Sequence, residues 1–153
     1  MYTPNFEFHR TSQEKADVFL AWQRPDKAFF ASGACHILAH QFLSLHIGQG
    51  YQLIRIEPAA GQPGSHYYAS NGTWSFDYNG WLKESQMLLA MEKAYTEKYS
   101  SWTYTRTVLT EGLVAHIASG NHNLRPPEYF PYLPWERAYT YIHKFSSEPP
   151  ITD

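Results

Sequence analysis

The sequence has a single cysteine, no run of basic residues and no long apolar stretch, and each absence argues against a class of protein. With Cys35 alone, an intramolecular disulfide framework is excluded, which fits a reducing compartment. Lysine and arginine number 12 against 14 acidic residues, for a net charge of −2, so we expect no nucleic-acid partner. No stretch approaches the roughly 20 apolar residues that a membrane helix needs, so we expect no membrane association.

The composition is that of one folded domain. Apolar residues make up 43% of the 153 residues and aromatic residues 17%, which is enough for a core without covalent cross-links. We therefore expect a single domain over residues 1–153. The segment 1–10 lacks the basic region and the apolar run of a signal peptide, so the sequence predicts a cytoplasmic protein.

Hydrophobic periodicity and turn signals predict an α+β fold. Helices are expected over 11–23, 34–46, 81–99 and 109–119, the first of them beginning with a capping-box pattern at Thr11 and Glu14. Strands are expected over 51–56, 65–70, 73–78 and 137–145. The stretch 100–106 is ambiguous, and we find no internal repeat.

The dipeptide Asn71-Gly72 is the strongest short hairpin signal in the chain. If it forms a two-residue turn, the numbers of paired residues sum to 143, and His66 lies directly opposite Asp77. Directly opposed residues share one face of a sheet, with β-carbons about 4.5–5.5 Å apart. A carboxylate in that position fixes the tautomer of the imidazole, so this pair is the orienting half of a catalytic triad.

Cys35 is the candidate nucleophile. Ser32-Gly33 precedes the predicted helix as a plausible cap, which places the thiol at the helix N-terminus. Free backbone N–H groups and the positive end of the helix dipole stabilise a thiolate there, and a charged histidine nearby lowers the thiol pKa further. The same N–H groups could stabilise an oxyanion. The sequence therefore predicts a triad of Cys35, His66 and Asp77.

These segments also carry a resemblance to a known family. The run 33–39, Gly-Ala-Cys-His-Ile-Leu-Ala, resembles the Gly-x-Cys-x-x-x-Ala nucleophile segment of transglutaminase-like proteins. The run 66–77 is similar to their hairpin, in which a histidine and an aromatic residue precede Gly, Trp and Asp. The resemblance to this papain-like and transglutaminase-like superfamily covers 32–80, and outside it we recognise nothing.

The resemblance implies a helix carrying the cysteine, packed against a small antiparallel sheet, with further helices. It also implies acyl transfer through a thioester, ending in hydrolysis, deamidation or transfer to an amine, without a cofactor. A peptide, a protein or a small amide would suit this chemistry as substrate, and nothing in the residues selects among them or sets the oligomeric state.

The sequence departs from the family pattern at two positions. Phe29 stands six residues before Cys35, where papain-like proteases have the oxyanion glutamine, and Tyr78 follows Asp77, where transglutaminases usually have proline. The oxyanion would then be held by the backbone of Cys35 and by a side chain that the pattern does not identify. The side chains considered for this role are Gln23, Tyr51 and Tyr68.

Two other interpretations are open. The chain could be a non-catalytic binding or interaction module that keeps the fold without using the triad. It could also bind a metal through His36 and His40, four residues apart on the predicted helix, together with Cys35 or His46. No second cysteine, no His-Glu-x-x-His motif and no carboxylate on that helix completes such a site, so we expect no metal.

The segment 126–135 is rich in proline and aromatic residues. It could line a substrate groove or hold a partner, with Trp81 and Trp135 at the border of the cleft. The simpler interpretation is an irregular loop that packs aromatic rings over the core, and we favour it.

Overall fold

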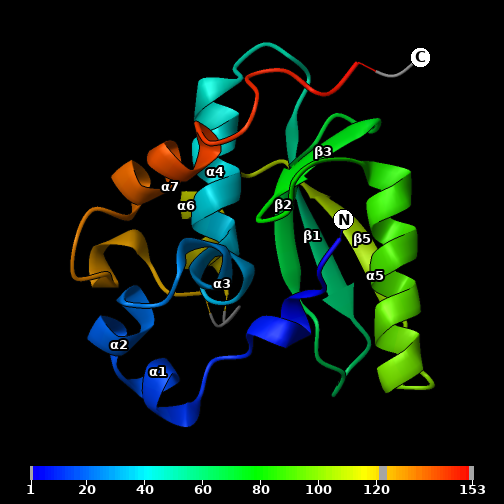
Figure 1. Ribbon diagram of the computed structural model, residues 1–153, viewed down its shortest axis with the longest axis horizontal. Helices are drawn as coiled ribbons and strands as arrows, with labels where there is room; N and C mark the ends of the chain where they lie inside the picture. Colours follow the sequence, from blue (N-terminus) through cyan, green and yellow to red (C-terminus); the bar gives the residue numbers. More distant parts are fainter. Residues whose placement is uncertain (1, 121–123, 152–153) are drawn as a thin grey trace.

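The protein has an α+β architecture built on a five-stranded antiparallel sheet, seen in a computed structural model that describes residues 2–120 and 124–151 (Figure 1). The strand order is β4-β3-β2-β1-β5. The strands are β1 (Gln52–Pro58), β2 (His66–Ser70), β3 (Trp74–Asp77), β4 (Gly80–Lys83) and β5 (Tyr104–Leu109). The α-helices are α1 (Ser12–Ala16), α2 (Val18–Trp22), α3 (Asp26–Ala31), α4 (Cys35–Leu45), α5 (Glu84–Lys98), α6 (Leu113–Ser119) and α7 (Pro134–Ile142), with short 3-10 helices η1 (Asn5–Phe8) and η2 (Pro127–Tyr129).

Helices cover both faces of the sheet. In Figure 1, α4 lies on one side of the strands with α3 and α7 beyond it, and α5 lies on the opposite side. The α4 side is filled by a cluster that includes Ile37, Phe42 and Phe76, whereas the α5 side is filled by a cluster that includes Ile54 and Met87. Both faces of the sheet are therefore buried, and strand residues contribute alternately to the two clusters.

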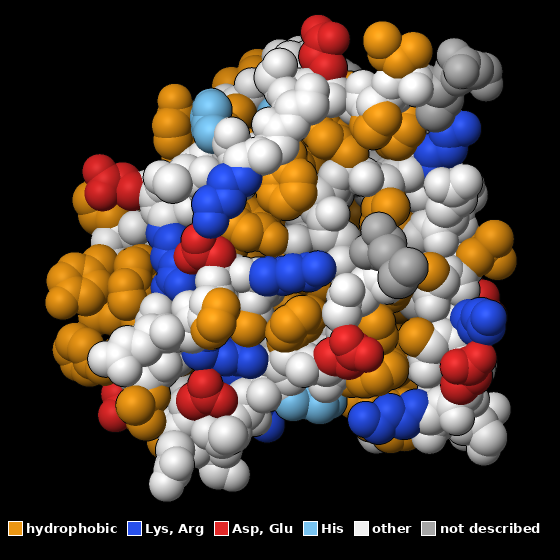
Figure 2. All heavy atoms as spheres, in the orientation of Figure 1, with side chains coloured by type: hydrophobic (Ala, Val, Ile, Leu, Met, Phe, Trp, Pro, Cys, Tyr) orange, Lys and Arg blue, Asp and Glu red, His pale blue; other side chains and the backbone are white. Residues whose placement is uncertain are grey.

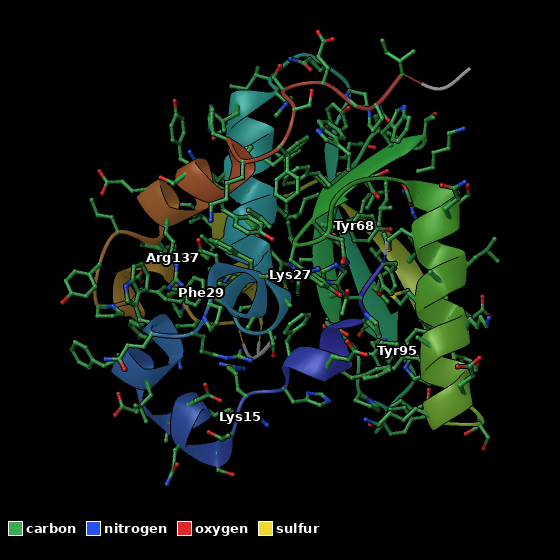
Figure 3. The ribbon with its side chains drawn as sticks, in the orientation of Figure 1. Lys15, Lys27, Phe29, Tyr68, Tyr95 and Arg137 are labelled. Atoms are coloured by element: carbon green, nitrogen blue, oxygen red, sulfur yellow. The ribbon has the colours of Figure 1, made fainter. Side chains whose placement is uncertain are left out.

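The labelled side chains of Figure 3 mark these two layers. Tyr68 and Tyr95 lie between the sheet and α5, in the cluster that also contains Met91. Phe29 and Arg137 lie in the other layer, where the guanidinium carbon of Arg137 is 4.0 Å from the centre of the Phe29 ring. The arginine thus ties α7 to α3 on the side of the molecule that carries α4.

The predicted first helix is interrupted at its middle. Its capping box forms as expected, with the Thr11 and Glu14 side chains each accepting a hydrogen bond from the other residue's backbone N–H. At Asp17 the backbone becomes extended, and the carboxylate accepts hydrogen bonds from the N–H groups of Phe19 and Leu20. Asp17 lies in the middle of the expected helix but acts as the N-cap of a new one, so the expected helix is divided into α1 and α2.

Four further segments differ from the secondary structure expected from the sequence. The predicted strand over 137–145 is wrong, because Pro134 starts helix α7 at its first turn and this helix runs to Ile142. Residues 80–83 form edge strand β4 before α5 begins at Glu84, and the ambiguous stretch contributes the other edge strand, β5. The helix expected over 109–119 begins only at Leu113.

The hairpin forms in a different register from the predicted one. Gly72 and Thr73 are the turn residues, with Gly72 at φ +91°. Asn71 follows the last residue of β2 and donates its backbone N–H to the carbonyl of Trp74, and its side chain accepts hydrogen bonds from the N–H groups of Thr73 and Trp74. Paired residues consequently have numbers that sum to 145, as in Ala69 and Phe76. The direct opposition of His66 and Asp77 is therefore wrong. A slip of two positions still leaves these residues on one face of the sheet.

In the part of the chain that the structure describes, no helix is both long enough and apolar enough to cross a membrane. Several large apolar side chains are nevertheless exposed, and Figure 2 shows hydrophobic side chains gathered at the left edge of the molecule, over α2 and the segment before α7. They include Phe19, Tyr129, Tyr132 and Leu133.

Candidate active site

The structure brings His66 and Asp77 together despite the changed register. The Nε2 atom of His66, the first residue of β2, lies 3.0 Å from Oδ2 of Asp77, the last residue of β3. Both side chains are buried, with 2% and 4% of their surface exposed. Because a carboxylate can only accept, Nε2 carries the hydrogen, and the other ring nitrogen, Nδ1, is left as the basic atom.

Asp77 is itself held in place by the backbone that follows it. Its second oxygen, Oδ1, accepts a hydrogen bond of 2.7 Å from the N–H of Asn79. Asn79 in turn accepts from the N–H of Thr3 and is anchored to the N-terminal segment. The carboxylate therefore has a fixed direction, which it passes on to the imidazole of His66.

Cys35 lies at the N-terminus of α4, as predicted. Ala34 occupies the N-cap position and has no side chain that could accept a hydrogen bond from the first turn. Gly33, at φ +112°, turns the chain from α3 into α4, a conformation that side-chain-bearing residues rarely adopt. As a residue Cys35 is partly buried, neither fully enclosed in the core nor fully exposed.

The thiol and the imidazole act on each other electrostatically. Burial raises the pKa of the Cys35 thiol, but interactions with the side chains of His36 and His66 outweigh burial and lower it from 9.0 to about 5. Burial alone would lower the pKa of His66, but interactions with Asp77 and Cys35 raise it to about 9. Between these two values the pair is a thiolate beside an imidazolium.

The Nδ1 atom of His66 is buried and has no well-aligned hydrogen-bond partner in the described residues. The ring packs against Tyr68 and Tyr78, and besides Asp77 the thiol of Cys35 raises its pKa. In unliganded active sites, hydrogen bonds between nucleophile and base are often long or poorly aligned and tighten when substrate binds. In the ion pair the imidazolium holds the proton that the thiol has lost and can return it to a leaving group.

A second histidine flanks the thiol. His36 is 1% exposed, and its Nε2 lies 2.8 Å from the carbonyl oxygen of Arg125. Since a carbonyl can only accept, Nε2 carries the hydrogen, and Nδ1 is buried without a hydrogen-bond partner in the described residues. His36 was considered from the sequence only as a metal ligand or a hydrogen-bonded residue, and its place beside the thiol was missed.

A pocket of about 290 Å³ opens in front of the thiol. This volume is at the lower end of the range of roughly 300–1,000 Å³ that is typical of small-molecule sites. Its lining residues come from the N-terminal segment, the turn before α4, and strands β1 and β2. They are Asn5, Arg10, Ala31, Ser32, Gly33, Cys35, His36, Arg55, Ser65, Tyr67 and Leu124. His66 and Asp77 do not line the pocket.

The first turn of α4 offers donors for an oxyanion. The first four N–H groups of a helix have no carbonyl partner within it, and Ala34 provides no capping side chain for those of Cys35 and His36. Two N–H groups next to a nucleophile can hold the negative oxygen of a tetrahedral intermediate. The additional side chains expected for this role do not contribute, since Gln23, Tyr51 and Tyr68 do not line the pocket.

Comparison with protein-family models, with curated proteins and with solved structures finds no match to this chain.

The aromatic residues expected at the border of the cleft lie elsewhere. Trp81 packs against Phe42 and Tyr51 near the other end of α4, and Trp135 packs on the ring of His40. Of the segment 126–135, Phe130 is buried against Trp22 and Phe29, so this part of the segment packs over the core as the simpler interpretation predicts.

Metal binding gains no support from the geometry. Within residues 2–120 and 124–151, no group of three or more His, Cys, Asp or Glu side chains could hold a metal ion. His46 stacks on Phe42 and bonds to backbone carbonyls at the end of α4, away from Cys35 at its beginning.

A second pair of a histidine and a carboxylate, bonded to the pocket residue Tyr67, was not foreseen. Nδ1 of His116 lies 2.8 Å from Oε1 of Glu111, and its Nε2 lies 2.8 Å from the hydroxyl of Tyr67. The hydroxyl therefore donates to Nε2, because Nδ1 donates its hydrogen to the carboxylate. Burial raises the pKa of Tyr67 to about 12, so this hydroxyl keeps its proton at neutral pH.

Proposed function

We propose that this protein is a cysteine-dependent acyl-transfer enzyme of the papain-like and transglutaminase-like kind. The observation that carries the proposal is the partly exposed Cys35 at the start of α4, facing a pocket, with a thiol pKa of about 5 and an imidazole partner at about 9. An inert structural cysteine in an apolar core has the opposite shift, a raised pKa. A helix that starts with cysteine and packs on an antiparallel sheet also supports this fold assignment.

The proposed reaction has two steps. The Cys35 thiolate attacks the carbonyl carbon of an amide, forming a carbon–sulfur bond, while the backbone N–H groups of the first turn of α4 hold the negative oxygen. The carbon–nitrogen bond then breaks, and the amine leaves with the proton of the His66 imidazolium. His66 next removes a proton from water or from an amine, which attacks the thioester and releases the acyl product and the thiolate. Asp77 keeps Nδ1 of His66 directed at these atoms.

The first test is the rate of Cys35 alkylation by iodoacetamide at about pH 6, followed by mass spectrometry. Because the chain has one cysteine, every labelled thiol is Cys35. A thiol with a pKa near 5 is almost fully ionised at that pH, and we expect it to react at least tenfold faster than glutathione measured in parallel. Cys35→Ser is the blank.

The second test asks for the acyl-enzyme itself. The activated ester p-nitrophenyl acetate should leave an acetyl group on Cys35 of the wild type but not on Cys35→Ser, and at a much lower rate on His66→Gln. Alkylation no faster than that of glutathione, together with no acetylation, would contradict the proposal and favour a binding module on the same fold. Rapid alkylation without acetylation would limit the protein to an activated thiol.

A further inference from the structure

The pocket in front of Cys35 is basic, although the chain as a whole carries a net charge of −2. Arg10 and Arg55 both line it, and none of the described lining residues is acidic. A hydrolase for neutral amides has no need of two arginines there, since uncompensated charges in a confined site are costly. Their position suggests what the pocket binds.

Arg10 is held against the turn that precedes the nucleophile. A β-carbon at Gly33 would lie only 3.2 Å from Nη1 of Arg10, so the guanidinium packs on the bare glycine two residues before Cys35. Its Nε atom is buried and has no hydrogen-bond partner in the described residues. A backbone hydrogen bond and the charge of Arg10 both help to lower the pKa of Glu14. The Glu14 carboxylate nevertheless forms its ion pair with Arg24, with 3.2 Å between Oε2 of Glu14 and Nε of Arg24.

Arg55 reaches the pocket from the middle of strand β1. It is paired directly across the ladder with Tyr67, and its guanidinium carbon lies 5.8 Å from the centre of that ring. Its ion pair with Glu57 is long, 3.6 Å from Nη1 to Oε2, and the glutamate is 53% exposed. The Nε atom of Arg55 is buried without a partner in the described residues. The contact with Glu57 therefore leaves donors of the guanidinium unused.

We propose that this pocket binds a carboxylate, and that the acyl group which Cys35 accepts is carried by an acidic substrate. This inference rests on the proposed function. Two guanidinium groups with unused planar donors match the geometry of a carboxylate, which binds arginine through two parallel hydrogen bonds. Both arginines line the pocket, and its volume of about 290 Å³ suits a short acidic group.

The test compares two alkylating reagents of nearly the same size, neutral iodoacetamide and anionic iodoacetate. In both reactions the Cys35 sulfur forms a bond to the methylene carbon and iodide leaves, so only the charge of the reagent differs. Glutathione gives the ratio of the two rates for a thiol without a basic pocket. We expect the ratio of iodoacetate to iodoacetamide rates at Cys35 to exceed that of glutathione about tenfold, and to fall with added salt.

Variants localise the effect. Arg10→Gln and Arg55→Gln should each lower the ratio about threefold to tenfold, and because both rates are measured on the same variant, the ratio cancels any change in the reactivity of the thiol itself. Lys93→Gln removes the same charge from an exposed position of α5 and should leave the ratio unchanged. If Arg10→Gln does not fold, the ratio in Arg55→Gln and the salt dependence of the wild-type ratio decide whether the pocket attracts the anionic reagent. A wild-type ratio equal to that of glutathione would overturn the proposal.

The outcomes separate this inference from the proposed function. If iodoacetamide reacts rapidly but the ratio of iodoacetate to iodoacetamide rates equals that of glutathione, the proposal of an activated thiol stands and the proposal of an acidic substrate is contradicted. Slow reaction with both reagents at about pH 6 removes the proposed function. The ratio is then measured at about pH 9, where an unactivated thiol is largely ionised, and decides on the carboxylate site by itself.

Competition distinguishes two sources of the carboxylate. Glutarate and an N-acetylated tetrapeptide containing glutamate, each at millimolar concentration, are tested for slowing the labelling of Cys35 by iodoacetamide. Protection by glutarate alone assigns the pocket to small dicarboxylic acids and their amides, whereas protection by the peptide alone assigns it to acidic peptide segments. Protection by neither, at low salt, would overturn the proposal.

Discussion

Two pairs of a histidine and a carboxylate each act on a residue that lines the same pocket, Cys35 in one case and Tyr67 in the other. In one, His66 and Asp77 are both almost fully buried, and the ring interacts with the thiol of Cys35. In the other, His116 is buried but Glu111 is 42% exposed, and the ring accepts a hydrogen bond from the hydroxyl of Tyr67.

Each pair contacts a third group, the thiol of Cys35 or the hydroxyl of Tyr67, and the acidity of that group decides whether the histidine can take its proton. A thiol whose pKa falls to about 5 gives up its proton to the histidine and becomes a nucleophile. The hydroxyl of Tyr67, with its pKa raised by burial to about 12, keeps its proton and only fixes the ring that lines the pocket. We therefore expect the His66 pair to determine reactivity and the His116 pair to stabilise one wall.

The largest effect on the alkylation rate of Cys35 is expected when each of the two histidines is replaced by glutamine in a separate variant. In His66→Gln the Cys35 thiol loses the imidazolium that stabilises its anion, so its pKa returns towards 9. At about pH 6 the alkylation rate by iodoacetamide should fall about a hundredfold. In His116→Gln it should fall less than threefold. A similar loss in both variants would mean that the two pairs act as one network.

Replacing each carboxylate by its amide in a separate variant should again slow alkylation more in the His66 pair than in the His116 pair, but the difference should be smaller. Asp77→Asn removes the charge that raises the pKa of His66, and the amide can present its NH₂ group to Nε2 and favour the wrong tautomer. We expect the alkylation rate at about pH 6 to fall roughly thirtyfold. Glu111→Gln, in an exposed position, should change it less than twofold. Thermal denaturation of both variants is the control for folding.

The pH dependence follows from the two pKa values of the first pair. The alkylation rate of Cys35 should rise about tenfold between pH 4 and pH 6 because the thiolate forms near pH 5. Acyl transfer to a poor leaving group should decline above about pH 9, where the imidazolium of His66 loses its proton. A rate that rises only near pH 8.5 would show an ordinary thiol.

The same values give the direction of the stability change. The pKa of Cys35 is lowered by folding, so its contribution to stability is lost as the pH falls through about 5. The pKa of His66 is raised, so its contribution is lost as the pH rises through about 9. Between about pH 6.5 and 9 the gain at Cys35 and the loss at His66 offset each other, so the melting temperature should fall on the acidic side, below about pH 6.5, and Cys35→Ala should flatten that branch.

Much of the fold was predictable because its signals are local. The stripe of apolar residues in α4, the capping box at Thr11 and the turn at Gly72 each depend on residues within a few positions of one another. The strand predicted over 137–145 failed because Tyr139, Tyr141 and neighbouring residues suit both strands and an amphipathic helix, and packing against α4 decides between them.

The candidate site divides in the same way. Cys35, His66 and Asp77 could be proposed from a helix start and a hairpin, even though the register was wrong by two positions. Arg10 and His36 could not be assigned, because their roles depend on the packing of Arg10 on Gly33 and of His36 on Arg125 across 89 residues of sequence. Arg55 gave one signal that went unused, a charge within the apolar run 53–56 of β1.

The smallest effect on reactivity is expected from Tyr67→Phe, which isolates the second pair from the first. The substitution removes the hydrogen bond to Nε2 of His116 and keeps the ring that lines the pocket and faces Arg55. We expect the free energy of unfolding, measured by urea denaturation, to fall by about 1 kcal/mol, because a buried acceptor loses its donor. The alkylation rate of Cys35 at about pH 6 should stay within twofold of the wild type. A larger loss would show that the hydroxyl of Tyr67 takes part in activating the thiol, and would assign the pair of His116 and Glu111 to the chemistry.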